Sequence, residues 1–136
     1  MIVRQNGMHR TRVPQGAVIF VVAVILRLIA VQQLGDLPIS RTPQLDSAIY
    51  LSWAKEIVGD PTFWPEYPEH APGYPIFVAL ILALSNGSLM AVRVVQAILG
   101  AIACVGTARV ASRAIAPNAF LPAGLLQAAY APLIYV

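Results

Sequence analysis

Two long apolar runs constrain the fold of this chain more than any other feature. Positions 13–34 hold about 22 mostly apolar residues, and positions 89–108 form a second such run. A helix rises 1.5 Å per residue, so about 20 apolar residues cross the roughly 30 Å hydrocarbon core of a bilayer. Charged residues make up only 11% of the chain, against about a quarter in soluble domains. We therefore expect an all-α polytopic membrane protein.

Arginines predict the orientation. Residues 1–12 carry three arginines and a histidine. We expect the protein to be integral to the cell (inner) membrane, with this basic tail in the cytoplasm. The first span, 13–34, then runs outward and leaves residues 35–88 as an outer loop. The second span, 89–108, returns, and a cytoplasmic loop follows at 109–117. A third span begins at about 118 and is unfinished at Val136, so we expect the N-terminal part of a longer protein.

The first helix expected in the outer loop covers about 43–59. Pro43 suits a first helical position, Gly59 suits the position just after a helix, and Pro61 forbids continuation. Apolar residues recur every four positions, which predicts a helix resting on the membrane surface. This stripe consists of Leu45, Ile49, Trp53 and Ile57.

A second loop helix is expected over about 74–86. Its apolar core, "YPIFVALILAL", has only 11 residues before "SNGS", a length more often interfacial or re-entrant than spanning. If this segment does not cross the membrane, Arg109 and Arg113 fall in the cytoplasm. If it does cross, both face outside, against the positive-inside rule. We favour the interfacial interpretation.

The outer loop also concentrates the acidic residues. All six acids lie between positions 35 and 75, together with only two of the nine basic residues. Asp46 is the first candidate for chemistry, as a general base or a metal ligand. The alternative is an acid favoured at a helix start by the macrodipole. Tyr50 lies four residues later and so on the same flank.

Four further residues could bind a substrate or metal. Glu69 and His70 lie in "PEHAPGYP". Glu69 could bind a metal ion, and His70 could bind a metal ion or a phosphate. The alternative is that both are solvated loop residues. Arg27 lies within the first span, where it either snorkels to the outer headgroups or faces a buried phosphate. Arg93 could meet the same phosphate or anchor the second span at the interface. No Lys/Arg run is interleaved with aromatics, so no nucleic-acid partner is expected.

The order of these features resembles a known family. After a charged N-terminus and one span come "LDSAIYLSWAKEIVGD", "EHAPGYPIFVALILAL" and "RVVQAILGAIACVGTARVASRA". This resembles the start of the GT-C membrane glycosyltransferases, in particular the protein O-mannosyltransferase and aminoarabinose transferase group (glycosyltransferase family 39 and kin). The likeness extends from Val13 onward. Its most specific parts are Asp-x-x-x-Tyr with a following Gly-Asp, and Pro-x-Tyr-Pro at a helix entry.

The resemblance implies an inverting transfer of one sugar, a hexose or pentose, from a polyprenyl-phosphate donor to an acceptor protein or glycolipid outside the cytoplasm. It places the catalytic aspartate at Asp46, with Ser47 where the family often has Glu. It matches Glu69 to a glutamate at a divalent metal ion, and His70 to a lysine position. The fragment alone would be inactive. The rival hypothesis is a non-enzymatic membrane protein, such as a transporter segment or an assembly subunit.

Overall fold

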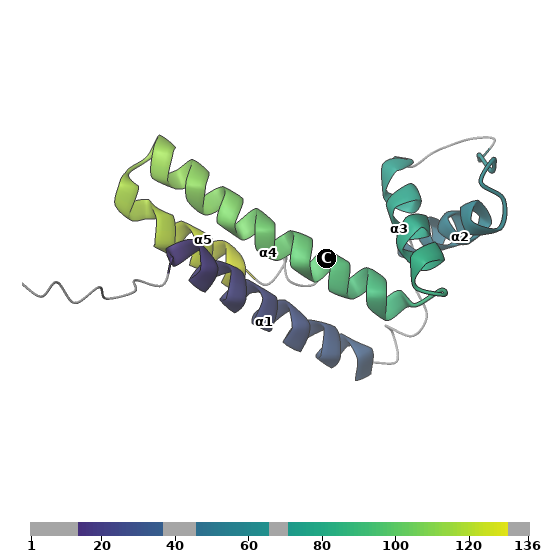
Figure 1. The fold of residues 1–136 in the computed structure, drawn as a ribbon, viewed down its shortest axis with the longest axis horizontal. Coiled ribbons are helices and arrows are strands. Elements are labelled where there is room, and N and C mark those ends of the chain that lie inside the picture. Colours follow the sequence, from purple (N-terminus) through teal and green to yellow (C-terminus); the bar gives the residue numbers. More distant parts are fainter. Residues whose placement is uncertain (1–13, 37–45, 66–70, 131–136) are drawn as a thin grey trace, which may run out of the picture.

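The chain is described here by a computed structural model, which covers residues 14–36, 46–65 and 71–130. Within these ranges every regular element is a helix, so the all-α prediction is confirmed for them. Figure 1 shows two long helices side by side, a short helix packed along one end of them, and a pair of helices at the other end.

The two long helices are α1, Gln15–Asp36, and α4, Leu89–Ala114. They are the two described helices that are long and apolar enough to cross a membrane, and they pack against each other. The predicted second span ended at 108, but α4 continues to Ala114, through part of the expected 109–117 loop. Positions 109–114 contain no proline or glycine to end the helix. It stops before a 3-10 turn that begins at Pro117.

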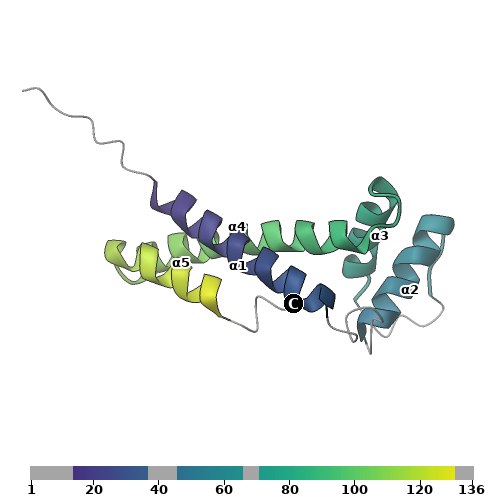
Figure 2. The same ribbon diagram turned by 90° about the horizontal axis from the view of Figure 1, so that it is seen from below.

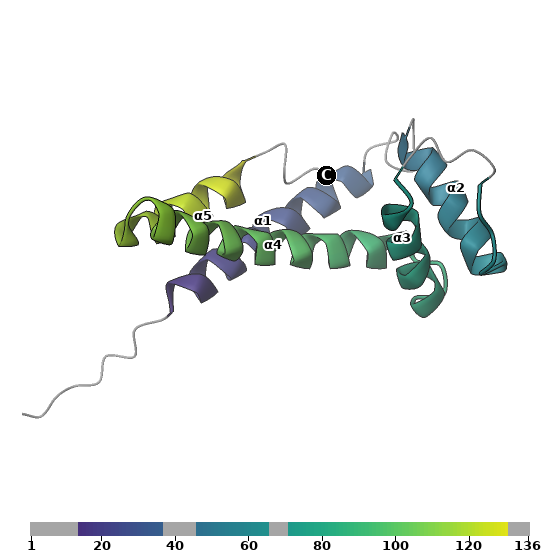
Figure 3. The same ribbon diagram turned by 90° about the horizontal axis from the view of Figure 1, so that it is seen from above.

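The loop helices are α2, Asp46–Gly59, and α3, Gly73–Leu84. They pack side by side and form the α2–α3 hairpin, which Figures 2 and 3 show beyond the end of α1. The 12 residues of α3 amount to about 18 Å, which is short of a bilayer core. The predicted helix start at 43 lies outside the described residues. Gly59 is the last residue of α2, not the residue after it.

The face of α2 that packs on α3 includes Ile57 of the predicted stripe, and contact of that stripe with a membrane surface stays a prediction. Ala54 is fully buried against α3, with Leu51 and Ile57 beside it. Ile49, from the predicted stripe, is 37% exposed. The small Ala54 side chain lets the α3 backbone approach closely, whereas a branched side chain would hold the helices apart. Ala54 therefore lies at the centre of the contact between α2 and α3.

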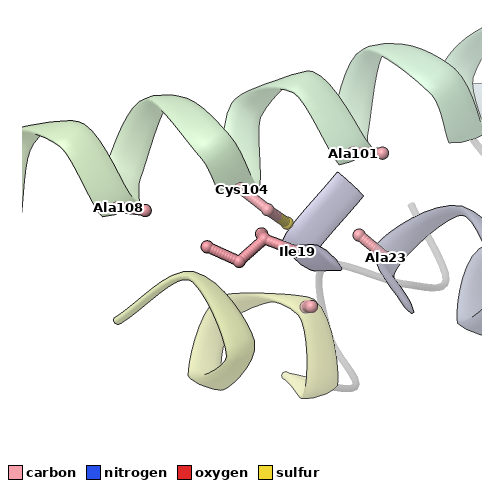
Figure 4. Close-up of a cluster of buried hydrophobic side chains, with 6 residues drawn as sticks. Ile19, Ala23, Ala101, Cys104 and Ala108 are labelled. Atoms are coloured by element: carbon pink, nitrogen blue, oxygen red, sulfur yellow. The ribbon is translucent and has the colours of Figure 1, made fainter. Parts of the chain in front are cut away.

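A second buried cluster joins α1, α4 and α5, Phe120–Ala129. Figure 4 shows its small side chains between the helices. The members are Ile19, Ala23, Ala101, Cys104, Ala108 and Ala128. Gly124 of α5 lies so close to Ile19 that a Cβ there would come within 2.5 Å of the Ile19 Cδ1 atom. Small residues thus set the close spacing of these three helices.

The third predicted span, 118–136, differs from the described helix. α5 has 10 residues and ends at Ala129, which is half the length that a span needs. The following residue, Tyr130, has an extended backbone with φ −72° and ψ 103°. Residues 131–136 lie outside the described part of the chain, so a continuous span over 118–136 stays a prediction.

Candidate functional site

Asp46 is the first residue of α2, and its side chain is exposed. The N-terminus of a helix carries a partial positive charge that favours a carboxylate there. An exposed carboxylate is also accessible to a substrate hydroxyl. The position of Asp46 is therefore compatible with both roles considered for it, a general base and a helix-start acid.

Tyr50 connects α2 to the rest of the molecule through α3. Its ring meets the Tyr74 ring edge to face, with centroids 5.1 Å apart and an interplanar angle of 77°, which is a favoured aromatic geometry. The Tyr74 hydroxyl in turn accepts a hydrogen bond of 2.7 Å from Nε2 of Gln96 on α4. Side chains from α2, α3 and α4 thus form one connected row.

Arg93 lies on α4, three residues before Gln96, so the two side chains project on the same side of the helix. Arg93 is half-buried. The contacts from Tyr50 through Tyr74 therefore reach α4 at Gln96, one helical turn after Arg93.

Arg27 is buried between α1 and α4, with 3% of its surface exposed. Its side chain passes over Gly100, where a Cβ would come within 2.5 Å of the Arg27 Nε atom. Gly100 lies four residues after Gln96 and seven after Arg93, so all three share one face of α4. Arg27 of α1 therefore contacts the same face of α4 that carries Arg93. The contact lies at Gly100, about two helical turns after Arg93.

The direction of the Arg27 side chain differs from a snorkelling arginine. Its Nη1 atom donates to the carbonyl oxygen of Ala23 at 3.4 Å, one turn toward the N-terminus of α1. Snorkelling to the expected outer face would carry the guanidinium toward the other end of α1. Because Arg27 is buried, contact with a ligand would require α1 and α4 to separate there.

Glu69 and His70 lie outside the described residues, so their expected roles at a metal or phosphate stay predictions. Among the residues that are described, no group of three or more His, Cys, Asp or Glu side chains could hold a metal ion. Cys104 is fully buried in the cluster of α1, α4 and α5.

Sequence reasoning did not single out Tyr74, Gln96 or Gly100 as parts of the site. Two local signals were available. Gln96 is a polar residue in an otherwise apolar segment, where such residues usually bond to another helix. Glycine inside a helix lowers its stability by about 1 kcal/mol against alanine and therefore often marks close packing.

No protein-family model, curated protein or solved structure matches this chain. We therefore infer its function from the chemistry of the residues. The candidate site residues that the structure describes include an exposed carboxylate at the start of α2, the edge-to-face ring pair of Tyr50 and Tyr74, and a half-buried arginine on α4.

Proposed function

We propose that this chain is part of a membrane glycosyltransferase of the GT-C type. It moves a sugar from a polyprenyl-phosphate donor to an acceptor protein or glycolipid at the outer face of the cell membrane, with Asp46 as general base. The observation that carries the proposal is the row from Tyr50 through Tyr74 to Gln96. It attaches the helix that begins at Asp46 to α4, which is long and apolar enough to span.

The apolar surfaces support a site at a bilayer interface. Ile49 of α2 is 37% exposed and Leu80 of α3 is 60% exposed, although both belong to short helices attached to one end of α4. Such surfaces suit burial at the headgroup boundary. A lipid-linked donor would then stay in the bilayer while its acceptor arrives from water.

The proposed reaction is a single displacement at the anomeric carbon. Asp46 takes the proton of an acceptor hydroxyl while the hydroxyl oxygen forms a bond to the anomeric carbon. The bond from that carbon to the phosphate oxygen breaks, and the polyprenyl phosphate leaves with the electron pair. Attack opposite the leaving group inverts the anomeric carbon. Arg93 offers positive charge to the departing phosphate.

A divalent metal ion at Glu69 is part of the same proposal. When bound, it would supply Lewis-acid stabilisation of the phosphate. Glu69 lies outside the described residues.

The test is sugar transfer by the full-length enzyme carrying Asp46→Asn. We expect a rate loss of about 10²-fold or more, the typical contribution of a general base. Asp60→Asn is the matched control, because it removes another acid of the same loop and leaves Asp46 in place. Unchanged transfer by the Asp46→Asn protein at equal expression would remove Asp46 from the mechanism.

The orientation has its own test. In a Cys104→Ala background, Ser47→Cys supplies one thiol next to Asp46 at an exposed position. A membrane-impermeant maleimide should label it from outside intact cells. Labelling only after the inner face is opened to the reagent would contradict the outer placement of α2.

Arg27 favours the rival function, a segment of a transporter or assembly subunit, because it is buried between helices and belongs to a candidate span. Buried arginines in spans often serve transport pathways or subunit assembly. If this rival holds, Arg27→Gln abolishes cellular function while Asp46→Asn leaves it intact. The glycosyltransferase proposal expects Asp46→Asn to abolish it.

A further inference from the structure

The corner between α3 and α4 is a tight turn. Asn86 and Gly87 both have positive φ, 54° and 81°, and the Gly87 N–H donates to the Leu82 carbonyl at 2.8 Å. Ser88 then caps α4 by accepting from the Ala91 N–H at 3.3 Å. The turn fixes where the two helices meet, but a corner alone leaves the angle between them adjustable.

The Tyr74–Gln96 hydrogen bond joins the two helices far from this corner. Tyr74 is the second residue of α3, ten residues before its end, and Gln96 lies seven residues into α4. At 1.5 Å per residue, the bonded side chains start about 15 Å and about 10 Å from the corner. A bond across the open side of an angle restrains it more strongly than contacts near the vertex. Figures 1 and 3 show α3 set across the beginning of α4.

The α2–α3 hairpin is held together by its own cluster. Ala54, Val78 and Leu82 are buried within it, and Val92 brings in the first turn of α4. Among the described helices α2 contacts α3, and α3 provides the contact with α4. A change in the angle between α3 and α4 would therefore move α2, and Asp46 with it, as one body.

We propose that Tyr74 and Gln96 are positioning residues, whose hydrogen bond sets the angle of the α2–α3 hairpin against α4. The consequence for Asp46 rests on the proposed function, whereas the restraint on the angle does not. Tyr74 also receives the edge-to-face contact of Tyr50, so the same ring orients the helix that starts at Asp46.

A distance measurement between spin labels tests the restraint. Lys55→Cys on α2 and Ala103→Cys on α4 are both exposed sites, labelled in a Cys104→Ala background. Tyr74→Phe keeps the ring and removes the hydroxyl, and Gln96→Leu removes the amide. Because a hydrogen bond contributes modestly on balance, each variant should raise the population of other angles roughly two- to twelve-fold. The distance distribution should broaden accordingly.

The double variant should broaden the distribution no more than either single variant, because both remove the same bond. Gln96→Glu should restore a narrow distribution, since the tyrosine hydroxyl can donate to a carboxylate. Tyr130→Phe, at an exposed tyrosine directly after α5, is the control. Unchanged distributions in either single variant, additive broadening, or no recovery with Gln96→Glu would overturn the restraint.

Sugar transfer separates the two proposals. If both hold, Tyr74→Phe lowers transfer and broadens the distances, while Asp46→Asn abolishes transfer with distances unchanged. Broadened distances with unchanged transfer would overturn the positioning role toward Asp46. Full transfer by Asp46→Asn would show that Asp46 is not the general base. The distance distributions would still test whether the Tyr74–Gln96 bond restrains the angle between α3 and α4.

Discussion

The Asp60 carboxylate, directly after α2, stabilises the turn that follows the helix. Its Oδ1 atom accepts from the Thr62 hydroxyl at 2.7 Å and from the Thr62 N–H at 2.9 Å. These two bonds hold the pKa of Asp60 below its ordinary value of 3.8. A lowered pKa in the folded chain means that the turn is fully stabilised above pH 3.8, and that this stabilisation is lost as pH falls through the folded value.

The first prediction concerns the causes of that lowered pKa. Thr62→Ala removes the hydroxyl, which is the larger cause, so the pKa of Asp60 should rise toward 3.8. Thr62→Ser keeps the hydroxyl and should keep the pKa low. An NMR titration of the Asp60 carboxyl carbon gives both values. Equal midpoints for the alanine and serine variants would show that the hydroxyl is not responsible.

A second residue-scale prediction uses two glycines of α4. At Gly100 an added Cβ meets the buried Arg27 side chain at 2.5 Å, whereas at Gly106 it meets nothing within 4 Å. Both substitutions to alanine gain the same helix propensity, so their difference isolates the contact. Gly100→Ala should be less stable than Gly106→Ala by about 1–3 kcal/mol, the usual cost of overpacking.

Thermal unfolding in detergent micelles measures this difference. Equal stabilities would mean that Arg27 moves aside freely, and that Gly100 does not define its position. The pair thus tests whether the arginine is held between α1 and α4 by shape.

At the scale of elements, the contact of α5 with α1 depends on Gly124 and Ile19. A Cβ at Gly124 would approach the Ile19 Cδ1 atom to 2.5 Å and both Cγ atoms to 3.0 Å. Gly124→Ala should therefore destabilise the chain by about 1–3 kcal/mol, and Ile19→Ala by about 2–5 kcal/mol through the cavity it leaves.

Combined, the two substitutions should cost less than the sum of their separate effects. The new methyl group occupies part of the space that Ile19 vacates, so we expect a coupling of about 0.5–3 kcal/mol. Unfolding of both single variants and the double variant completes the cycle. Strict additivity would show that α5 does not pack on Ile19 as described.

At the scale of the whole molecule, the two buried clusters share no residue. One joins α1, α4 and α5, and the other joins the α2–α3 hairpin to the start of α4. Because stability is not uniform across such a structure, the hairpin should open locally without the long helices.

Val78→Ala tests this separation. Val78 is 4% exposed in the hairpin cluster, and its truncation should cost about 1–3 kcal/mol. Amide exchange should speed up in α2 and α3 and stay unchanged in α1. Val110→Ala, at a residue that is 66% exposed on α4, is the control. Faster exchange throughout α1 would show that the molecule unfolds as one unit.

Local signals in the sequence determined which segments become helices. The long apolar runs predicted α1 and α4, and the "SNGS" segment predicted the turn after α3. Both signals come from residues that are neighbours in the sequence. The end of the apolar run at 108 and the arginines at 109 and 113 predict where the chain leaves the membrane, and they do not predict where the helix ends. The helix continues through them because nothing in their backbone chemistry interrupts it.

Tertiary structure alone decided which side chains meet. Arg27 reaches Gly100, and Tyr74 reaches Gln96, only because of how α1 and α3 lie against α4. The face of α2 that became buried was likewise set by the fit of Ala54 against α3. Such contacts depend on the shapes of two surfaces far apart in the chain, and no periodicity within one helix contains that information.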